Sequence, residues 1–186
     1  PLVKAAGADK GSTSALSRDH TIHVDQSGLL TIVGGKWTTY RHMAEDCVNH
    51  AITLGELRDV PCGTADLKIH GYKQDVASLT SLGVYGSDAE AILALAAADE
   101  RLAKPLHPAL PYIGAEVIWG VRTEMARTVD DILSRRTRAL FLNARAAIEM
   151  APAVAKLMAE ELGTGQDWID QQLIEFNQLA AKYLLP

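Results

Sequence analysis

The sequence has 186 residues and a formal net charge of -5, and 48% of its residues are hydrophobic and 5% aromatic. This length suits one sizeable domain, or one domain with part of another, and the apolar content is ample for a buried core. The acidic balance disfavours a nucleic-acid or anionic-membrane binder, because such proteins gain affinity by neutralising phosphates with Lys and Arg. No apolar run approaches the roughly 20 residues of a membrane span, and nothing at the start reads as a signal peptide.

The two cysteines, Cys47 and Cys62, do not have metal-ligand spacing, and we expect no metal site. Cys47 falls on the apolar face of a predicted helix, so a buried free thiol is expected rather than a disulfide, in a reducing intracellular compartment. The chain starts at Pro1 without a preceding Met. We therefore expect it to have been cut from a longer protein.

The first part of the chain predicts a loop followed by a β-hairpin and a helix. Residues 1–17 are rich in Gly, Ser and Thr and read as a loop. Residues 20–25 alternate between polar and apolar, as in a half-buried strand, and residues 29–33 form an apolar run typical of a strand buried on both faces. The pair Gly34-Gly35 ends this second strand.

A helix is expected next, because apolar residues recur along one stripe at helical spacing. Thr38 or Thr39 can cap its start, and Gly55 can close its end. The apolar stripe consists of Tyr40, Met43, Ala44, Cys47, Val48, Ala51 and Ile52, and the other face carries Arg41, Glu45, Asp46 and Asn49.

Residues 56–73 contain Pro and Gly in mixed polarity and mark a domain boundary. We predict one domain over residues 1–60, a linker over 61–73 and a helical domain over 74–186. The segment Ser87-Asp88-Ala89-Glu90 reads as a capping box that opens a helix to about Asp99. Residues 101–111 contain three prolines and are expected to form a rigid connection.

The remaining helices follow from caps and apolar spacing. Ile113, Val117, Val121 and Met125 recur every four residues, and residues 128–131 can start a short helix.

Asn143 can cap a further helix, in which Pro152 is expected to give a kink or a break and Gly163 a stop. A last amphipathic helix runs from Trp168 to Tyr183, with Gln172 as the polar residue on its apolar stripe.

The segment after the second predicted strand carries the candidate chemistry. Gly34 and Gly35 at a strand end let the backbone approach a ligand closely, and the following helix offers free N–H groups and a positive dipole end. Lys36 adds a full positive charge. Such a site suits an oxygen that gains negative charge, on the pyrimidine edge of a reduced flavin or on a phosphate. On spacing alone, an ordinary turn with a solvated lysine is favoured.

The residues Gly34-Gly35-Lys36-Trp37-Thr38-Thr39-Tyr40-Arg41 and Met43-Ala44-Glu45-Asp46 resemble a motif of the FAD-dependent glycerol-3-phosphate dehydrogenases. Ser17-Arg18-Asp19-His20 resembles the Arg-bearing segment of that family. Residues 112–117, 131–138 and 141–143 resemble its helical carboxyl-terminal domain. The resemblance implies a mainly α chain: a helical carboxyl-terminal domain preceded by a β-hairpin and helix left over from an FAD-binding α/β domain.

The resemblance also implies an activity and a set of site residues. The family oxidises sn-glycerol 3-phosphate to dihydroxyacetone phosphate on FAD and passes electrons to a membrane quinone. Carried over, Arg18 contacts the substrate phosphate and Lys36 is the catalytic residue between flavin and substrate. Gly34, Gly35, Lys36, Trp37 and Thr38 bind the cofactor. A cytoplasmic protein is expected, with peripheral attachment to the inner face of the membrane and homo-oligomerisation left open.

Several parts of the family pattern do not occur in this sequence. The Rossmann segment that holds the FAD pyrophosphate, the histidine proposed as general base and a further phosphate-binding Arg are expected to lie outside the chain. Calcium-binding EF-hands are not expected either. The chain alone is therefore expected to be inactive and to bind no FAD.

Alternative interpretations remain open. The helices could form a docking module for a partner or a membrane surface, or the parent could be a glycerophosphate oxidase that uses oxygen. Arg18 could pair with Asp19 or Asp25 on the surface. His20 and His23 fall on opposite strand faces, and neither is read as catalytic. The cluster Arg135, Arg136 and Arg138 is interpreted as part of an ion-pair network with Glu124, Asp130 and Asp131 rather than as an anion site.

Overall fold

The computed structural model describes residues 19–184. The chain divides into two units, Pro1–Lys68 and Ile69–Pro186, which are described separately here. The division falls within the predicted linker over residues 61–73. The assignment of residues 1–60 to a remnant of an FAD- and substrate-binding domain stays a prediction.

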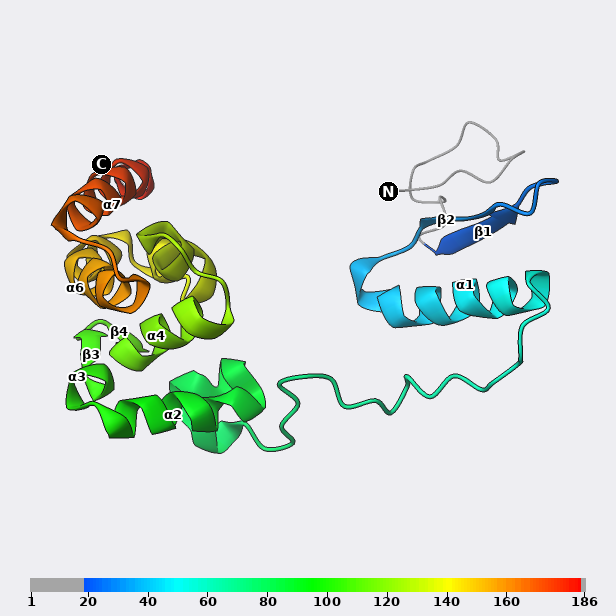
Figure 1. Cartoon of the computed structure of the whole chain (residues 1–186), viewed down its shortest axis with the longest axis horizontal. Coiled ribbons are helices and arrows are strands. Elements are labelled where there is room, and N and C mark those ends of the chain that lie inside the picture. Colours follow the sequence, from blue (N-terminus) through cyan, green and yellow to red (C-terminus); the bar gives the residue numbers. More distant parts are fainter. Residues whose placement is uncertain (1–18, 185–186) are drawn as a thin grey trace. The chain divides into compact units, whose positions relative to one another are not determined.

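The first unit consists of a β-hairpin followed by a helix (Figure 1). Its elements are β1 (His20–Val24), β2 (Leu30–Gly34), the 3-10 turn η2 (Trp37–Thr39) and α1 (Tyr40–Leu54). The strands are antiparallel, with Ile22 opposite Ile32 and His20 opposite Gly34. The hairpin turn is closed by the Asp25 carboxylate, which accepts hydrogen bonds from the Ser27 N–H at 2.8 Å and the Ser27 hydroxyl at 2.6 Å.

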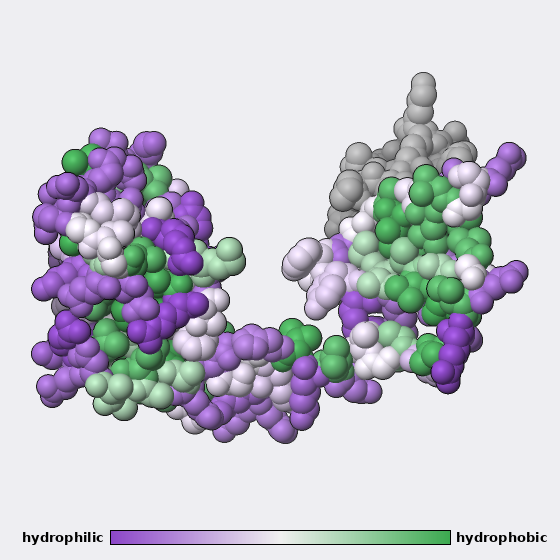
Figure 2. All heavy atoms as spheres, viewed as in Figure 1, coloured by the Kyte–Doolittle hydropathy of each residue, from purple (hydrophilic) through white to green (hydrophobic). Residues whose placement is uncertain are grey.

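The expectation that β2 is buried on both faces is wrong. Both strands alternate between half-buried and exposed residues, and Val33 is 42% exposed. The physical reason is that this sheet has two strands, so its second face has no layer over it among the described residues. In Figure 2, apolar residues gather on the visible face of this unit, over the hairpin and α1.

Helix α1 starts and ends where its caps predicted, with Thr39 before it and Gly55 after it. Its apolar stripe is covered only in part: Met43 and Cys47 are half-buried, whereas Val48 is 55% exposed. None of residues 19–68 is fully buried. A hairpin with one helix is too small to enclose a core, so this outcome follows from size. Both cysteines are free, and Cys47 is half-buried rather than buried.

The second unit is mainly helical, and with α1 it confirms the expectation of a mainly α chain. Its elements, in chain order, are η3 (Ala77–Asp88), α2 (Ala89–Ala98), α3 (Glu100–Ala103), β3 (Pro105–His107), β4 (Leu110–Ile113), α4 (Gly114–Thr123), η4 (Asp131–Arg136), α5 (Ala139–Leu142), α6 (Ala144–Leu162), α7 (Gln166–Ala180) and η5 (Ala181–Tyr183).

A second hairpin lies where a rigid connection was expected. Strands β3 and β4 pair antiparallel within residues 105–113, and these strands were not predicted in the rigid connection expected over 101–111. These strands were not predicted because they contain Pro105 and Pro111. Proline lacks a backbone N–H donor and therefore argues against a central strand. A two-stranded sheet has only edge strands, and proline is tolerated there.

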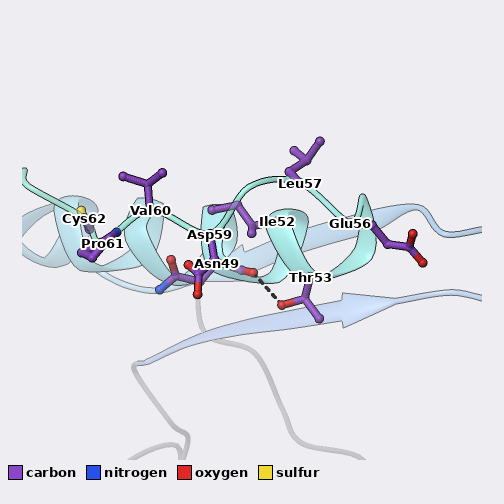
Figure 3. A pocket seen from close by; sticks show the side chains of 9 residues that line it. All are labelled: Asn49, Ile52, Thr53, Glu56, Leu57, Asp59, Val60, Pro61 and Cys62. Carbon is purple, nitrogen blue, oxygen red and sulfur yellow. Dashed lines mark hydrogen bonds between the residues drawn. The ribbon is translucent and has the colours of Figure 1, made fainter.

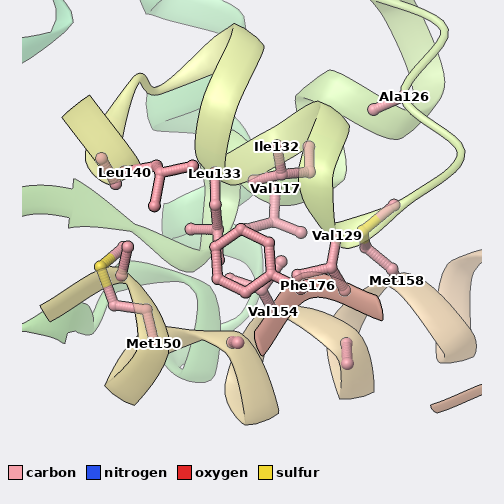
Figure 4. Close-up of a cluster of buried hydrophobic side chains, with 14 of the residues drawn as sticks. Val117, Ala126, Val129, Ile132, Leu133, Leu140, Met150, Val154, Met158 and Phe176 are labelled. Carbon is pink, nitrogen blue, oxygen red and sulfur yellow. The ribbon is translucent and has the colours of Figure 1, made fainter. Parts of the chain in front are cut away.

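The core of the second unit is formed by α4, η4, α5, α6 and α7. Figure 4 shows the Phe176 ring of α7 among side chains from the other elements, including Leu133 and Val154. A smaller cluster joins η3, α2 and α4 through Leu82 and Ile92. These buried apolar clusters supply the main stabilisation that the first unit lacks.

The caps of α6 are as predicted. The Asn143 side chain accepts a hydrogen bond of 3.1 Å from the Ala146 N–H, and Gly163 ends the helix with a φ of 69°. The helix runs through Pro152 without a break, where a kink or a break was expected.

Two other local expectations are wrong. The capping box predicted at Ser87–Glu90 does not form, because η3 continues through Asp88 and no side chain caps α2. The Asp88 carboxylate pairs with the His70 imidazole at 2.7 Å. Met125 lies beyond the end of α4, is 78% exposed and has a φ of 60°. The period of four residues therefore ends at Val121, which is buried.

Candidate functional site

The turn after β2 adopts a backbone conformation that suits glycine. Gly34 and Gly35 have φ angles of 83° and 77°, a region that side chains with a Cβ disfavour. The Gly35 N–H donates to the Asp19 carbonyl at 3.2 Å. A Cβ built on Gly35 would lie 2.4 Å from the Met43 sulfur of α1. The two glycines therefore let the chain turn closely against the first turns of α1.

Lys36 lies directly after this turn and before η2. Its backbone is extended, with φ -124° and ψ 151°, and its carbonyl accepts hydrogen bonds of 3.0 Å from the N–H and the hydroxyl of Thr39. Lys36 itself is exposed. Within residues 19–184, no hydrogen bond or ion pair engages its ammonium group. The charge of Lys36 is thus available to a ligand near the turn.

The first helical residues after Lys36 present backbone donors. The N–H groups at a helix start have no acceptor inside the helix, and the dipole makes this end positive. Trp37 and Thr38 are both exposed. This combination of N–H groups with the ammonium group of Lys36 is suited to an electron-rich oxygen edge.

An aromatic pair adjoins the turn. The rings of Trp37 and Tyr40 lie 5.8 Å apart with an angle of 30° between their planes. Trp37 is 87% exposed and Tyr40 is 55% exposed. Large apolar rings are usually covered in a folded protein, so this pair offers a surface on which a flat ring or another side chain can pack.

His20, which was not expected to be catalytic, lies beside the same turn. The His20 side chain is only 6% exposed and lies between two carboxylates. Its Nε2 is 2.8 Å from Asp46 on α1, and its Nδ1 is 3.2 Å from Asp19. The bond to Asp46 raises the pKa of His20, burial opposes this shift, and the same bond lowers the pKa of Asp46.

Asp46, which was expected on the polar face of α1, contacts the hairpin through His20. Asp46 reaches His20 on β1 and is also 3.4 Å from His50 Nδ1. The signal that could have found the pair is strand alternation. His20 shares a face with Ile22 and Val24, so it faces the helix that covers the hairpin.

The structure leaves the proposed phosphate contact untested, since Arg18 lies outside the described residues. The arginine cluster of the second unit does form the expected ion pairs. Arg135 pairs with Asp130 and Asp131, and Arg136 with Glu124. Arg138, which precedes α5 with a φ of 61°, forms no ion pair with another residue of 19–184.

A cleft of the first unit lies elsewhere. It has a volume of about 620 Å³ and is lined by the second half of α1 and the segment that follows it (Figure 3). No residue of the predicted site lines it. Its carboxylates, Glu56 and Asp59, disfavour the anionic ligand for which the Gly34–Lys36 turn is suited.

Two general features of residues 19–184 bear on function. No group of three or more His, Cys, Asp and Glu side chains is arranged to hold a metal ion. No helix in this part of the chain is long and apolar enough to cross a membrane.

Sequence comparison identifies the family. Residues 26–170 match the family model described as the C-terminal domain of alpha-glycerophosphate oxidase. The chain belongs to the family of FAD-dependent glycerol-3-phosphate dehydrogenases and oxidases. The matched range includes β2, the Gly34–Lys36 turn, α1 and most of the helical unit.

Relatives from animals and bacteria agree with this assignment. The mitochondrial glycerol-3-phosphate dehydrogenase of Mesocricetus auratus is 39% identical over 92% of the chain. The human mitochondrial enzyme is 36% identical over 99% of it. Glycerol-3-phosphate dehydrogenase 1 of Mycobacterium bovis is 40% identical over 74%. The chain spans about a quarter of the length of these relatives, from 26% to 28%.

A solved structure shares the fold. The crystal structure of glycerol-3-phosphate dehydrogenase from Bacillus halodurans, complexed with FAD, matches with a TM-score of 0.60 and 26% identity. The match covers 86% of this chain and 36% of that one. The chain thus belongs to an FAD-dependent family and matches only part of the length of each of these relatives.

Proposed function

We propose that the chain is the carboxyl-terminal part of a flavoenzyme that oxidises sn-glycerol 3-phosphate to dihydroxyacetone phosphate. The observation that carries this proposal is the turn Gly34–Thr38, which joins helix-start N–H groups to Lys36, whose ammonium group has no partner among residues 19–184. The relatives named above, all glycerol-3-phosphate dehydrogenases, support the choice of substrate.

The residues of the turn fit one edge of a flavin. A bound FAD would supply the hydride acceptor of the reaction. Backbone N–H groups from Gly35 to Thr38 would donate hydrogen bonds to the oxygens of the pyrimidine edge. Lys36 would hold a positive charge where negative charge develops, which stabilises the charged state more than the neutral one.

Arg18 is assigned to the phosphate of the substrate. A guanidinium group can bind two phosphate oxygens at once through its planar fork of N–H donors. Arg18 lies two residues before His20 at the start of β1, and His20 is opposite Gly34.

The chain by itself is proposed to be inactive and to bind FAD negligibly. The turn would contact only the pyrimidine edge, whereas most dinucleotide affinity comes from a pyrophosphate site with a Rossmann glycine motif. The open apolar surface of the first unit supports this proposal. None of residues 19–68 is fully buried, as expected for a piece of a larger domain.

For the electron acceptor we propose a membrane quinone, with peripheral association of the parent enzyme with the membrane. Oxygen is the alternative acceptor, and the matched family model is described by an oxidase. A quinone and oxygen need different access routes to the flavin. A comparison of ubiquinone-analogue reduction with oxygen consumption by the full-length enzyme distinguishes them.

The helical unit as a docking module is the second alternative. Its support is an exposed apolar group in which the rings of Phe141 and Tyr183 pack edge to face at 5.5 Å.

The proposal is tested with Lys36→Ala in the full-length enzyme. We expect a lower flavin reduction potential and a lower kcat, because positive charge no longer stabilises the reduced flavin. Lys156→Ala is the matched control, since Lys156 is an exposed lysine on α6. If Lys36→Ala leaves both potential and turnover at the control values, Lys36 is a solvated turn residue and the site assignment fails.

A further inference from the structure

The start of the Gly34–Lys36 turn contacts β1, and the His20 side chain of β1 in turn contacts Asp46 on α1. On the backbone side, His20 is opposite Gly34 in the strand register, and the Gly35 N–H donates to the Asp19 carbonyl at 3.2 Å. On the side-chain side, His20 Nε2 reaches the Asp46 carboxylate on α1 at 2.8 Å. His20 thus touches the turn through its backbone and the helix through its ring.

The packing around the His20–Asp46 contact leaves little room for Gly35 or the His20 ring to move. The space that a Cβ on Gly35 would occupy is filled by Met43 of α1, and the His20 Cβ lies 3.4 Å from the same point. The His20 ring also contacts the His42 ring edge to face, with centroids 5.7 Å apart. A change in the distance between β1 and α1 would therefore move Gly35 and, with it, Lys36.

We propose that His20 is a positioning residue, whose protonated ring bridges Asp19 and Asp46 and thereby fixes the Gly34–Lys36 turn against α1. A neutral imidazole carries one N–H and can donate to only one of the two carboxylates. The protonated ring donates to both. The geometry of the turn then depends on the protonation of His20, and the importance of this dependence for catalysis rests on the proposed function.

The charges that face His20 favour its protonated form. They are Asp19 beside it, Asp46 from α1 and the His42 ring, and Asp46 is shared with His50. The two carboxylates outweigh the opposing effect of burial, so the pKa of His20 lies above its ordinary value of 6.5. The bridge is therefore complete at pH values below 6.5 and is lost as the pH rises through the raised pKa.

The first test uses the full-length protein, labelled selectively at histidine and glycine, and follows both by NMR from acid to alkaline pH. We expect the Gly35 amide signal to move with the same midpoint as the His20 ring. In Asp46→Asn, which keeps the size of the side chain and removes the charge, both midpoints should shift together to lower pH. A Gly35 amide that stays constant while His20 titrates would overturn the proposal.

His23 provides the matched control. It lies on the same strand with its side chain on the opposite, exposed face. His20→Gln should abolish the pH-dependent movement of Gly35, and His23→Gln should leave it intact. Equal effects of the two variants would show that the turn responds to general charge, and would contradict a specific role of His20.

The second test measures the flavin reduction potential and kcat of the full-length enzyme as functions of pH. A positioning role predicts that His20→Gln changes the pH dependence of the potential of the bound flavin, which mere loss of stability would not do. Misplacement by about 1 Å can lower a rate by as much as about a hundredfold, so we expect a fall in kcat within this range.

The two proposals can fail independently. If Lys36→Ala lowers the potential but Gly35 does not follow His20, only the positioning role is wrong. If Gly35 follows His20 but Lys36→Ala has no effect, the bridge exists and the flavin assignment of the turn is wrong.

Discussion

The side-chain oxygen of Gln172 accepts a hydrogen bond of 3.0 Å from the backbone N–H of Val129. This contact joins α7 to the segment before η4 inside the core of the helical unit. Gln172 is 7% exposed, and its amide nitrogen donates to Glu175 at 3.1 Å. A polar residue on an apolar helix stripe is thus explained by a buried backbone donor that requires a partner.

We expect Gln172→Leu to lower the free energy of unfolding of the helical unit by about 1–3 kcal/mol, because the Val129 N–H is left buried without an acceptor. Urea unfolding measures this change. Gln178→Leu is the control, since Gln178 is exposed on the same helix. If the two variants unfold at the same urea concentration, the Gln172 bond does not contribute to stability.

We expect Glu116 to make the stability of the helical unit depend on pH. Its carboxylate is 2% exposed and accepts hydrogen bonds from the Ile113 N–H at 2.8 Å and the Tyr85 hydroxyl at 3.1 Å. Burial raises the pKa of Glu116 above its ordinary value of 4.5, and the two hydrogen bonds oppose this shift. Burial also raises the pKa of Tyr85.

A raised carboxyl pKa means that the folded unit holds this proton more tightly than the unfolded chain. The stability of the unit should therefore increase as the pH falls from neutral towards 4.5 through the raised pKa. Glu116→Gln keeps an acceptor for Ile113 and should remove this contribution to the pH dependence. Thermal unfolding at several pH values measures it, and an unchanged pH profile in Glu116→Gln would contradict the assignment.

The helical unit should fold without the hairpin. Among the residues that the structure describes, its buried clusters come only from 69–184, so a chain that begins at Ile69 should show a helical circular dichroism spectrum and one cooperative unfolding transition. The start at Ile69 retains the hydrogen bond of 3.1 Å from the Ser87 N–H to the Gly71 carbonyl. A chain of residues 1–68 alone should not unfold cooperatively. A disordered spectrum for residues 69–186 would show that the first unit belongs to their core.

Arg18→Ala in the full-length enzyme should mainly weaken the binding of glycerol 3-phosphate. Charge-assisted hydrogen bonds contribute roughly 1.5–3 kcal/mol, so KM should rise by about tenfold to a hundredfold. Glycerol lacks the phosphate, and the variant should oxidise it about as well as the parent does. A KM for glycerol 3-phosphate that stays at the parent value would contradict the role of Arg18.

The elements most accurately predicted from the sequence were those with a strong local signal. Asn143 and Gly163 mark the ends of α6 through a side-chain cap and a left-handed glycine, and both act within a few residues. The capping box predicted at Ser87–Glu90 does not form, because the helical turn η3 continues through Asp88 and α2 begins at Ala89 without a side-chain cap. The hairpin β3–β4 was missed because its prolines argue against a strand unless the strand is known to be an edge.

The candidate site was predictable only in part. The family resemblance located Lys36 and the two glycines, and the structure gives both glycines the positive φ angles that the turn requires. The His20–Asp46 bridge was not predicted, because it joins a strand to a helix across 26 positions. Apolar periodicity shows which faces of two elements meet but does not show which polar residues pair at their edges.

The most direct test of the proposed function is anaerobic reduction of the flavin in the full-length protein by glycerol 3-phosphate. We predict that the substrate bleaches the absorbance of the bound oxidised flavin and yields dihydroxyacetone phosphate in equal amount, and that Lys36→Ala slows this bleaching while Lys156→Ala does not. A full-length protein that holds its flavin and is not reduced by glycerol 3-phosphate would contradict the proposed function.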